Sequence, residues 1–256
     1  MSAIAQMRTL SPSRVRASQH SFGARALVFL FWFVFVVREG FAVVGEVLGL
    51  TPSQATAAAG VVAALFLLAT TLMALFGRPS TSWRSLFQGV APMKWTGLFL
   101  FWSAVSITWT QADSKLVALG YLCLLLATVV TAVAQLKIFE PAELFNTAST
   151  GFVAGALTLV IIAIKADTGS GRLGDPDLLH PNTLGKITAI GALLAFHRIR
   201  LARSVAAKTY WSLAGIGLVC ALAATVSKTS LGAFVIACLV YFLAGPGVCA
   251  AGVAPR

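Results

Sequence analysis

The residues best suited to chemistry lie in one polar stretch between two apolar segments, residues 165–182. Three glycines between positions 169 and 174 allow tight turns that leave backbone amides open. Arg172 stands among them, and its planar guanidinium can bind a phosphate or carboxylate through two parallel hydrogen bonds. The spacing equally permits an ordinary loop in which Arg172 pairs with Asp175 or Asp177. An anion site and a structural ion pair are both compatible with this pattern.

The same stretch ends in His180-Pro181-Asn182, which opens the next apolar segment. Asn182 is a favourable helix-capping residue, and an exposed helix N-terminus beside an arginine attracts anions. His180 has a side chain suited to general-base chemistry. We nevertheless expect His180 to cap the helix or support the site, so the catalytic residue remains unknown at this point.

The elements that must position these residues are membrane helices, because the composition excludes a soluble globule. Of the 256 residues, 58% are hydrophobic and 11% are charged, whereas soluble domains carry about 25% charged residues. So few polar side chains cannot coat a water-soluble surface. Backbone polar groups in lipid must be paired within the segment, which favours an all-α fold.

Eight apolar segments approach the length of about 20 residues that crosses a bilayer. They are residues 22–41, 55–76, 95–109, 116–136, 147–164, 182–196, 210–226 and 230–244. We predict a polytopic bundle of about eight transmembrane helices over residues 22–244, with a basic tail at 1–21 and a short tail at 245–256. A cleaved signal peptide is the alternative for the first segment, but no A-x-A site follows it.

The net charge of +11 has an explanation in topology. With the N-terminus inside, 13 of the 19 lysines and arginines fall in inner gaps, 4 in outer gaps and 2 within segments. Inner loops of membrane proteins carry such an excess. We therefore predict a cytoplasmic N-terminus, a periplasmic loop at residues 165–181 and no nucleic-acid partner.

Three stretches carry a resemblance to a known family. Residues 171–174 (GRLG) followed by 180–185 (HPNTLG) are similar to the R-x-x-G…(N/H)-P-N-x-(L/F)-(A/G) signature of the O-antigen ligase and polymerase family. Residues 225–232 (TVSKTSLG) resemble that family's T-x-S-R-(G/T) turn, with Lys228 in place of the usual arginine. Residues 106–110 (SITWT) resemble its S-x-x-W-S motif.

The resemblance implies a GT-C-like glycosyltransferase of the bacterial inner membrane. Such an enzyme takes a glycan from undecaprenyl diphosphate on the periplasmic side and passes it to lipid A-core or a growing polysaccharide. By this resemblance Arg172 and Lys228 would bind the diphosphate. Arg38 is a third candidate because it is a charge inside an apolar segment, with pairing to Glu39 or Glu46 as the alternative. Membrane lipids are further partners, and we expect neither a metal nor a cofactor.

The sequence also departs from this family. The family's catalytic histidine lies in a large periplasmic loop that the chain does not contain, and its Gly/Ala/Pro/Val-rich tail is typical of a truncated product. We therefore expect the N-terminal part of such an enzyme, which binds substrate without transferring glycan by itself. The alternatives are a non-catalytic membrane partner in polysaccharide assembly and a transporter or flippase of a lipid-linked sugar. Transporters favour internal repeats and broken helices, which the sequence does not show.

Overall fold

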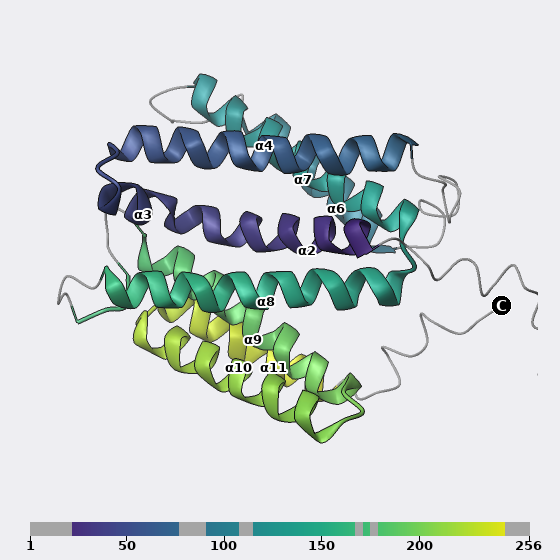
Figure 1. Cartoon of the computed structure of the whole chain (residues 1–256), viewed down its shortest axis with the longest axis vertical. Coiled ribbons are helices and arrows are strands. Elements are labelled where there is room, and N and C mark those ends of the chain that lie inside the picture. Colours follow the sequence, from purple (N-terminus) through teal and green to yellow (C-terminus); the bar gives the residue numbers. More distant parts are fainter. Residues whose placement is uncertain (1–21, 77–90, 108–114, 167–170, 175–178, 244–256) are drawn as a thin grey trace, which may run out of the picture. The chain divides into compact units, whose positions relative to one another are not determined.

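The computed structural model describes residues 22–76, 91–107, 115–166, 171–174 and 179–243, and this part of the chain contains helices and no strand (Figure 1). The helices group into two compact units. The first unit combines residues 1–31 with 64–147, and the second combines residues 32–63 with 148–256. Two long helices, α2 and α8, begin in the first unit and end in the second.

The first unit contains the start of α2 (Phe22–Val37), the end of α4 (Pro52–Phe76), α6 (Ala91–Ser106), α7 (Lys115–Ile138) and the start of α8 (Pro141–Lys165). An ion pair joins the first turns of α2 and α8, in which the Arg25 guanidinium donates to the Glu143 carboxylate. The N-terminal end of α2 is thereby attached to the N-terminal end of α8.

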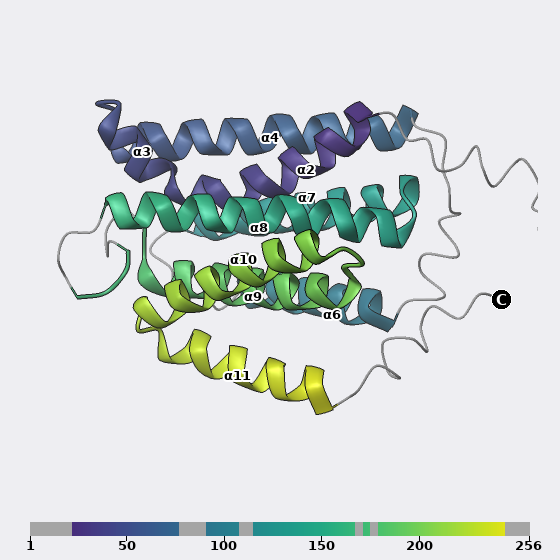
Figure 2. The ribbon, with the colours of Figure 1, turned by 60° about the horizontal axis from the view of Figure 1, so that its bottom comes forward.

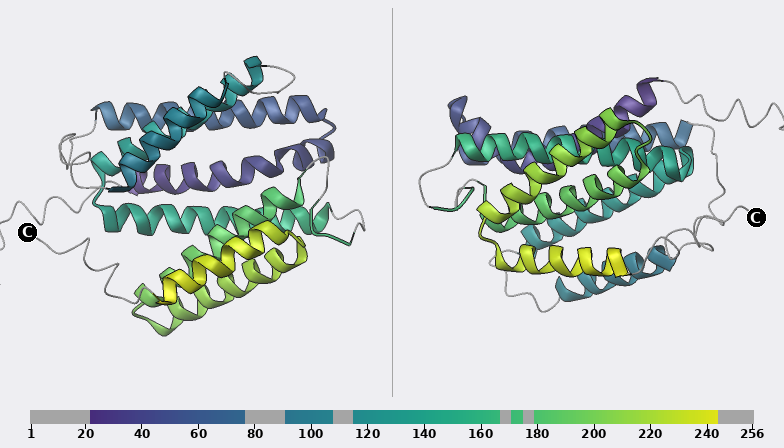
Figure 3. Two further views of the ribbon diagram at one scale, coloured as in Figure 1. Left: turned by 180° about the vertical axis from the view of Figure 1, so that it is seen from behind. Right: turned by 90° about the horizontal axis from the view of Figure 1, so that it is seen from below.

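The second unit contains the end of α2, the 3₁₀ turn η2 (Arg38–Gly40), α3 (Phe41–Val47), the start of α4, most of α8, and three consecutive helices. These are α9 (Pro181–Leu201), α10 (Val205–Ala224) and α11 (Lys228–Leu243). Short connections of three residues make α10 antiparallel to α9 and α11 antiparallel to α10, and α11 packs along α9 (Figures 2 and 3).

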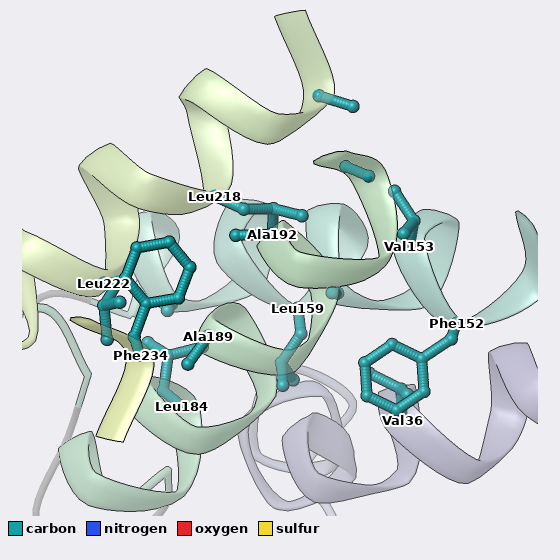
Figure 4. Close-up of a cluster of buried hydrophobic side chains, with 14 of the residues drawn as sticks. Val36, Phe152, Val153, Leu159, Leu184, Ala189, Ala192, Leu218, Leu222 and Phe234 are labelled. Atoms are coloured by element: carbon teal, nitrogen blue, oxygen red, sulfur yellow. The ribbon is translucent and has the colours of Figure 1, made fainter. Parts of the chain in front are cut away.

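The core of the second unit is formed by the inner faces of these helices. Its members come from α2, α3, α8, α9, α10 and α11 and from Leu179 just before α9. Ten are labelled in Figure 4: Val36, Phe152, Val153, Leu159, Leu184, Ala189, Ala192, Leu218, Leu222 and Phe234. Small residues on α9 bring the backbones together, because a Cβ at Gly191 would lie 3.0 Å from Leu218 Cδ1 and 3.3 Å from Ala156 Cβ. Close approach at small residues is how helices associate when lipid surrounds them.

The helix that begins at Phe22 is interrupted by η2 and then continues as α3 to Val47. Gly40 allows the turn to pack closely on α8, because a Cβ there would lie 2.7 Å from Leu159 Cδ1. A short 3₁₀ stretch within a long helix is typical of a hinge or a local irregularity. The break differs from the predicted first segment, which was a single helix over residues 22–41.

Three helical stretches are long and apolar enough to cross a membrane: Phe22–Val47, Pro141–Lys165 and Val205–Ala224. Shorter apolar stretches occur at Gly60–Ala69, Thr96–Ser106, Leu125–Leu136 and Lys228–Leu243. These helices indicate an all-helical membrane protein. The count of about eight spans, the GT-C-like architecture and the cytoplasmic N-terminus stay predictions, and the expected tails at 1–21 and 245–256 lie outside the described residues.

Candidate functional site

The loop that contains Arg172 lies against the turn between α10 and α11. The backbone N–H of Leu173 donates to the Ala224 carbonyl at 2.9 Å, and Arg172 Nε donates to the Thr225 carbonyl at 3.0 Å. The two partners of the second bond are separated by 53 positions. The two longest stretches of family resemblance therefore meet in space, and we take this end of α9, α10 and α11 as the candidate site.

Two glycines shape the loop, and one of them tolerates no side chain. Gly174 has a φ of +109°, and a Cβ there would lie 2.8 Å from the Leu179 carbonyl oxygen. Gly171 also has a positive φ, of +73°, but a Cβ there would have nothing within 4 Å. The loop thus requires glycine at position 174 for both conformation and space, and at position 171 for conformation alone.

The start of α9 is capped by His180. Its Nδ1 accepts a hydrogen bond from the Asn182 backbone N–H at 3.2 Å, and Pro181 occupies the first helical position. Asn182, which we expected to cap the helix, instead lies inside the first turn and donates to the cap. His180 and Asn182 are both exposed, so the cap is accessible from solvent.

Three hydroxyl side chains form a buried cluster beneath the loop, at Thr225, Ser227 and Ser230. Ser227 Oγ donates to Ser230 Oγ at 2.9 Å, and Thr225 Oγ1 donates to the Leu222 carbonyl at 2.7 Å while accepting from the Ser227 N–H at 3.3 Å. Between the two hydroxyls Val226 adopts a left-handed φ of 51°, which is strained for a β-branched residue. The cluster therefore holds a specific turn conformation.

The hydroxyl cluster packs against Gly185 of α9. A Cβ at this position would lie 2.9 Å from Ser227 Cβ, 3.0 Å from Ser230 Oγ and 3.1 Å from Thr225 Oγ1. In the sequence these residues stand out only as parts of the family-like turn at residues 225–232, and no role was predicted for the hydroxyls. The available signal was four hydroxyl residues within the six positions 225–230, between two apolar segments.

The other two predicted cations have different surroundings. Lys228 is exposed and begins α11, directly after the hydroxyl turn. Arg38 lies in η2, where its Nε donates to Glu39 Oε1 at 3.1 Å and its guanidinium lies 4.7 Å from the centre of the Phe35 ring. The turn with Lys228 thus adjoins the Arg172 loop, whereas the contacts seen for Arg38 are with its own helical segment.

The charge distribution at the candidate site suits an anion. Arg172 and Lys228 are exposed, and the sequence contains no aspartate or glutamate after Asp177. Asp175 and Asp177, the alternative partners of Arg172, lie outside the described residues, as does most of the 106–110 motif. Among the residues with assigned positions, no group of three His, Cys, Asp or Glu side chains could hold a metal ion.

Comparison with known proteins does not add to this assignment. No family model, no curated protein and no solved structure matches the chain. The features that bear on function are therefore the contact between the loop at residues 171–174 and the turn at residues 225–227, and the cations that this contact brings to one end of the helices.

Proposed function

We propose that the chain is an O-antigen ligase- or polymerase-like membrane protein that binds a glycan linked to undecaprenyl diphosphate. The glycan would be destined for lipid A-core or a growing polysaccharide. The observation that supports this is the hydrogen bond from Arg172 Nε to the Thr225 carbonyl. This bond joins the two longest stretches that resemble the family's signatures, 53 positions apart, at the end where the antiparallel helices α9 and α10 bring them together.

In this proposal the protein spans the bacterial inner membrane about eight times with its N-terminus in the cytoplasm. The end of α9, α10 and α11 that carries Arg172 then faces the periplasm. The diphosphate carries negative charge that grows as the glycan leaves, so fixed cations beside it would lower the free energy of that step. Arg172 would bind it with its position set by Thr225, and Lys228 would add a second charge.

Binding of undecaprenyl diphosphate to the purified full chain tests this proposal. Arg172→Ala and Lys228→Ala should each weaken binding about ten- to a hundredfold, because a hydrogen bond to a charged group contributes roughly 1.5–3 kcal/mol. Arg172→Lys should recover part of the loss, since lysine keeps the charge without the fork. The matched control is Lys165→Ala, which removes another exposed cation, at the end of α8.

Lys228→Ala is the more informative variant, because Arg172→Ala also removes a bond that holds the loop. Thermal unfolding of each variant separates the two effects. The proposal is rejected if Arg172→Ala and Lys228→Ala both bind undecaprenyl diphosphate as tightly as Lys165→Ala does.

Orientation has a separate test in cells, with single cysteines in a background that lacks the native four. Thr229→Cys should react with an impermeant thiol reagent from outside, and Ala206→Cys should not. Both positions are exposed, and Ala206 avoids the Ser204 side chain that caps α10. The opposite pattern of labelling would place the candidate site in the cytoplasm.

One observation favours the transporter or flippase as a second candidate function. The helix from Phe22 to Val47 is interrupted by the 3₁₀ turn at Arg38–Gly40, and transporters build substrate sites at such breaks. Proteoliposomes that contain a fluorescent lipid-linked sugar separate the two candidates. Movement of the lipid between leaflets, lost on Gly40→Leu, would support transport; its absence would leave the ligase-like proposal in place.

A further inference from the structure

The opposite end of α9 and α10 carries an unusual density of positive charge. Arg198, Arg200, Arg203 and Lys208 fall within eleven positions, around the turn that joins the two helices. The described carboxylates of this unit are Glu39 and Glu46, which belong to η2 and α3. Since η2 packs on the C-terminal half of α8, at Leu159 and Ile162, these carboxylates are not neighbours of the turn.

Two of the four arginine and lysine side chains are held against aromatic rings. The Arg198 guanidinium lies 4.8 Å from the centre of the Trp211 ring, and that of Arg200 lies 4.9 Å from the centre of the Tyr241 ring. Such stacking fixes a cation in place without neutralising its charge. Arg203 and Lys208 are exposed on the turn and on the first residues of α10.

Exposed apolar side chains alternate with these cations. Leu201 is 51% exposed and Val205 is 81% exposed, on either side of Arg203. α10 is one of the three helices long and apolar enough to cross a membrane, and in a helix that crosses the membrane the first residues would lie at its surface. Apolar, aromatic and basic side chains gathered around one turn match the boundary between acyl chains and headgroups.

We infer that residues 198–208, together with Trp211 and Tyr241, form a binding site for the phosphate headgroup of an anionic phospholipid. The acyl chains would contact Leu201 and Val205, while Arg203 and Lys208 would reach the phosphate. A soluble acidic partner would leave Leu201 and Val205 uncovered, so the bilayer lipid is the ligand that satisfies both kinds of side chain. This inference depends on the chain crossing a membrane and is independent of the glycan proposed at the other end of these helices.

Native mass spectrometry of the full chain, released from detergent and titrated with phosphatidylglycerol or phosphatidylcholine, tests the inference. We expect preferential retention of phosphatidylglycerol. Arg203→Gln with Lys208→Gln should weaken its binding roughly twenty-five-fold, since each basic residue at an anionic surface contributes about fivefold. The matched control, Lys165→Gln with Lys186→Gln, removes two exposed cations elsewhere in the same unit and should keep the preference.

The charge-conserving pair Arg203→Lys with Lys208→Arg should also keep the preference, which separates loss of charge from loss of fold. Equal retention of the two lipids by the parent would overturn the inference. So would an equal loss in the control pair. Competition by glycerophosphoglycerol, which lacks acyl chains, at the same concentration as the lipid would overturn the lipid assignment in favour of a free-phosphate site. Undecaprenyl diphosphate binding that survives in the Gln pair would show that the two sites are separate.

Discussion

The two ends of the α9–α10–α11 group are built on different principles. At the end with Arg172, contacts run through backbone carbonyls, glycines and buried hydroxyls, so the geometry of each atom matters. At the end with Arg200, cations lie over aromatic rings or extend into solvent, so the number of charges matters more than their exact placement. One methyl group should therefore damage the first end, while the second should tolerate changes of shape that preserve charge.

The largest expected effect is that of Gly174→Ala, which should destabilise the end of the helices with Arg172. Its φ of +109° strains any side chain, and the new Cβ would meet the Leu179 carbonyl oxygen at 2.8 Å. Strain and overpacking together should lower the free energy of unfolding by about 3 kcal/mol. Gly171→Ala is the matched control, since its positive φ should cost only about 1 kcal/mol in open space. Thermal unfolding in one detergent would compare them, and equal losses would show that the contact with Leu179 is unimportant.

Gly185→Ala should come next, because it inserts one methyl group between α9 and the hydroxyl cluster. The new Cβ would lie 2.9 Å from Ser227 Cβ and 3.0 Å from Ser230 Oγ. Overpacking of this kind costs about 1–3 kcal/mol of stability. Gly232→Ala in α11 is the control, because nothing lies within 4 Å of its Cβ position and alanine should stabilise a helix there by about 0.5–1 kcal/mol. If Gly185→Ala and Gly232→Ala changed the free energy of unfolding in the same direction, the hydroxyl cluster would not be tightly packed against Gly185.

Removal of a helix cap should lower the free energy of unfolding by less, and by a similar amount at both ends. His180→Ala removes the acceptor for the Asn182 N–H, and Ser204→Ala removes the acceptor for the Ala207 N–H. Each should cost about 1 kcal/mol of unfolding free energy, and His180→Asp should restore the first loss. Circular dichroism during thermal unfolding measures both. A loss at Ser204 without one at His180 would mean that the histidine is not an effective cap.

The sequence predicts the helices of this group well, because apolar composition alone places α9, α10 and α11 within a few residues. The cap of α9 was misassigned for an identifiable reason. Asparagine is the better capping residue by type, but Pro181 prefers the first helical position, which puts the cap one residue earlier, at His180. Position within the turn outweighed residue type.

The contact between Arg172 and Thr225 could not be derived from local pattern. It joins positions 53 apart through a side chain and a backbone carbonyl, and a carbonyl carries no residue-type signal. The charge count and the family resemblance both predict that the two stretches lie on the outer side of the membrane, but neither predicts which atoms meet. The break at Arg38–Gly40 was missed for a related reason, because the turn packs on Leu159 of a helix far along the chain.

The smallest expected effect is a pH dependence at the charged end. His197 follows the last residue of the expected sixth span, and its Nδ1 lies 3.0 Å from the Tyr241 hydroxyl. Burial, and then the charges of Arg200 and Arg198, lower the pKa of His197 below its ordinary value of 6.5. In the folded state the imidazole therefore stays neutral at pH values where the unfolded chain already binds a proton. Stability should be full above pH 6.5 and should fall as the pH drops from there to the lowered pKa, below which it levels off. Unfolding temperatures across this window measure the slope, which His197→Gln should flatten. Tyr241→Phe should keep most of it, because burial and the two arginines are the causes of the shift; a flat profile in Tyr241→Phe would instead make the hydroxyl the group that keeps the imidazole neutral.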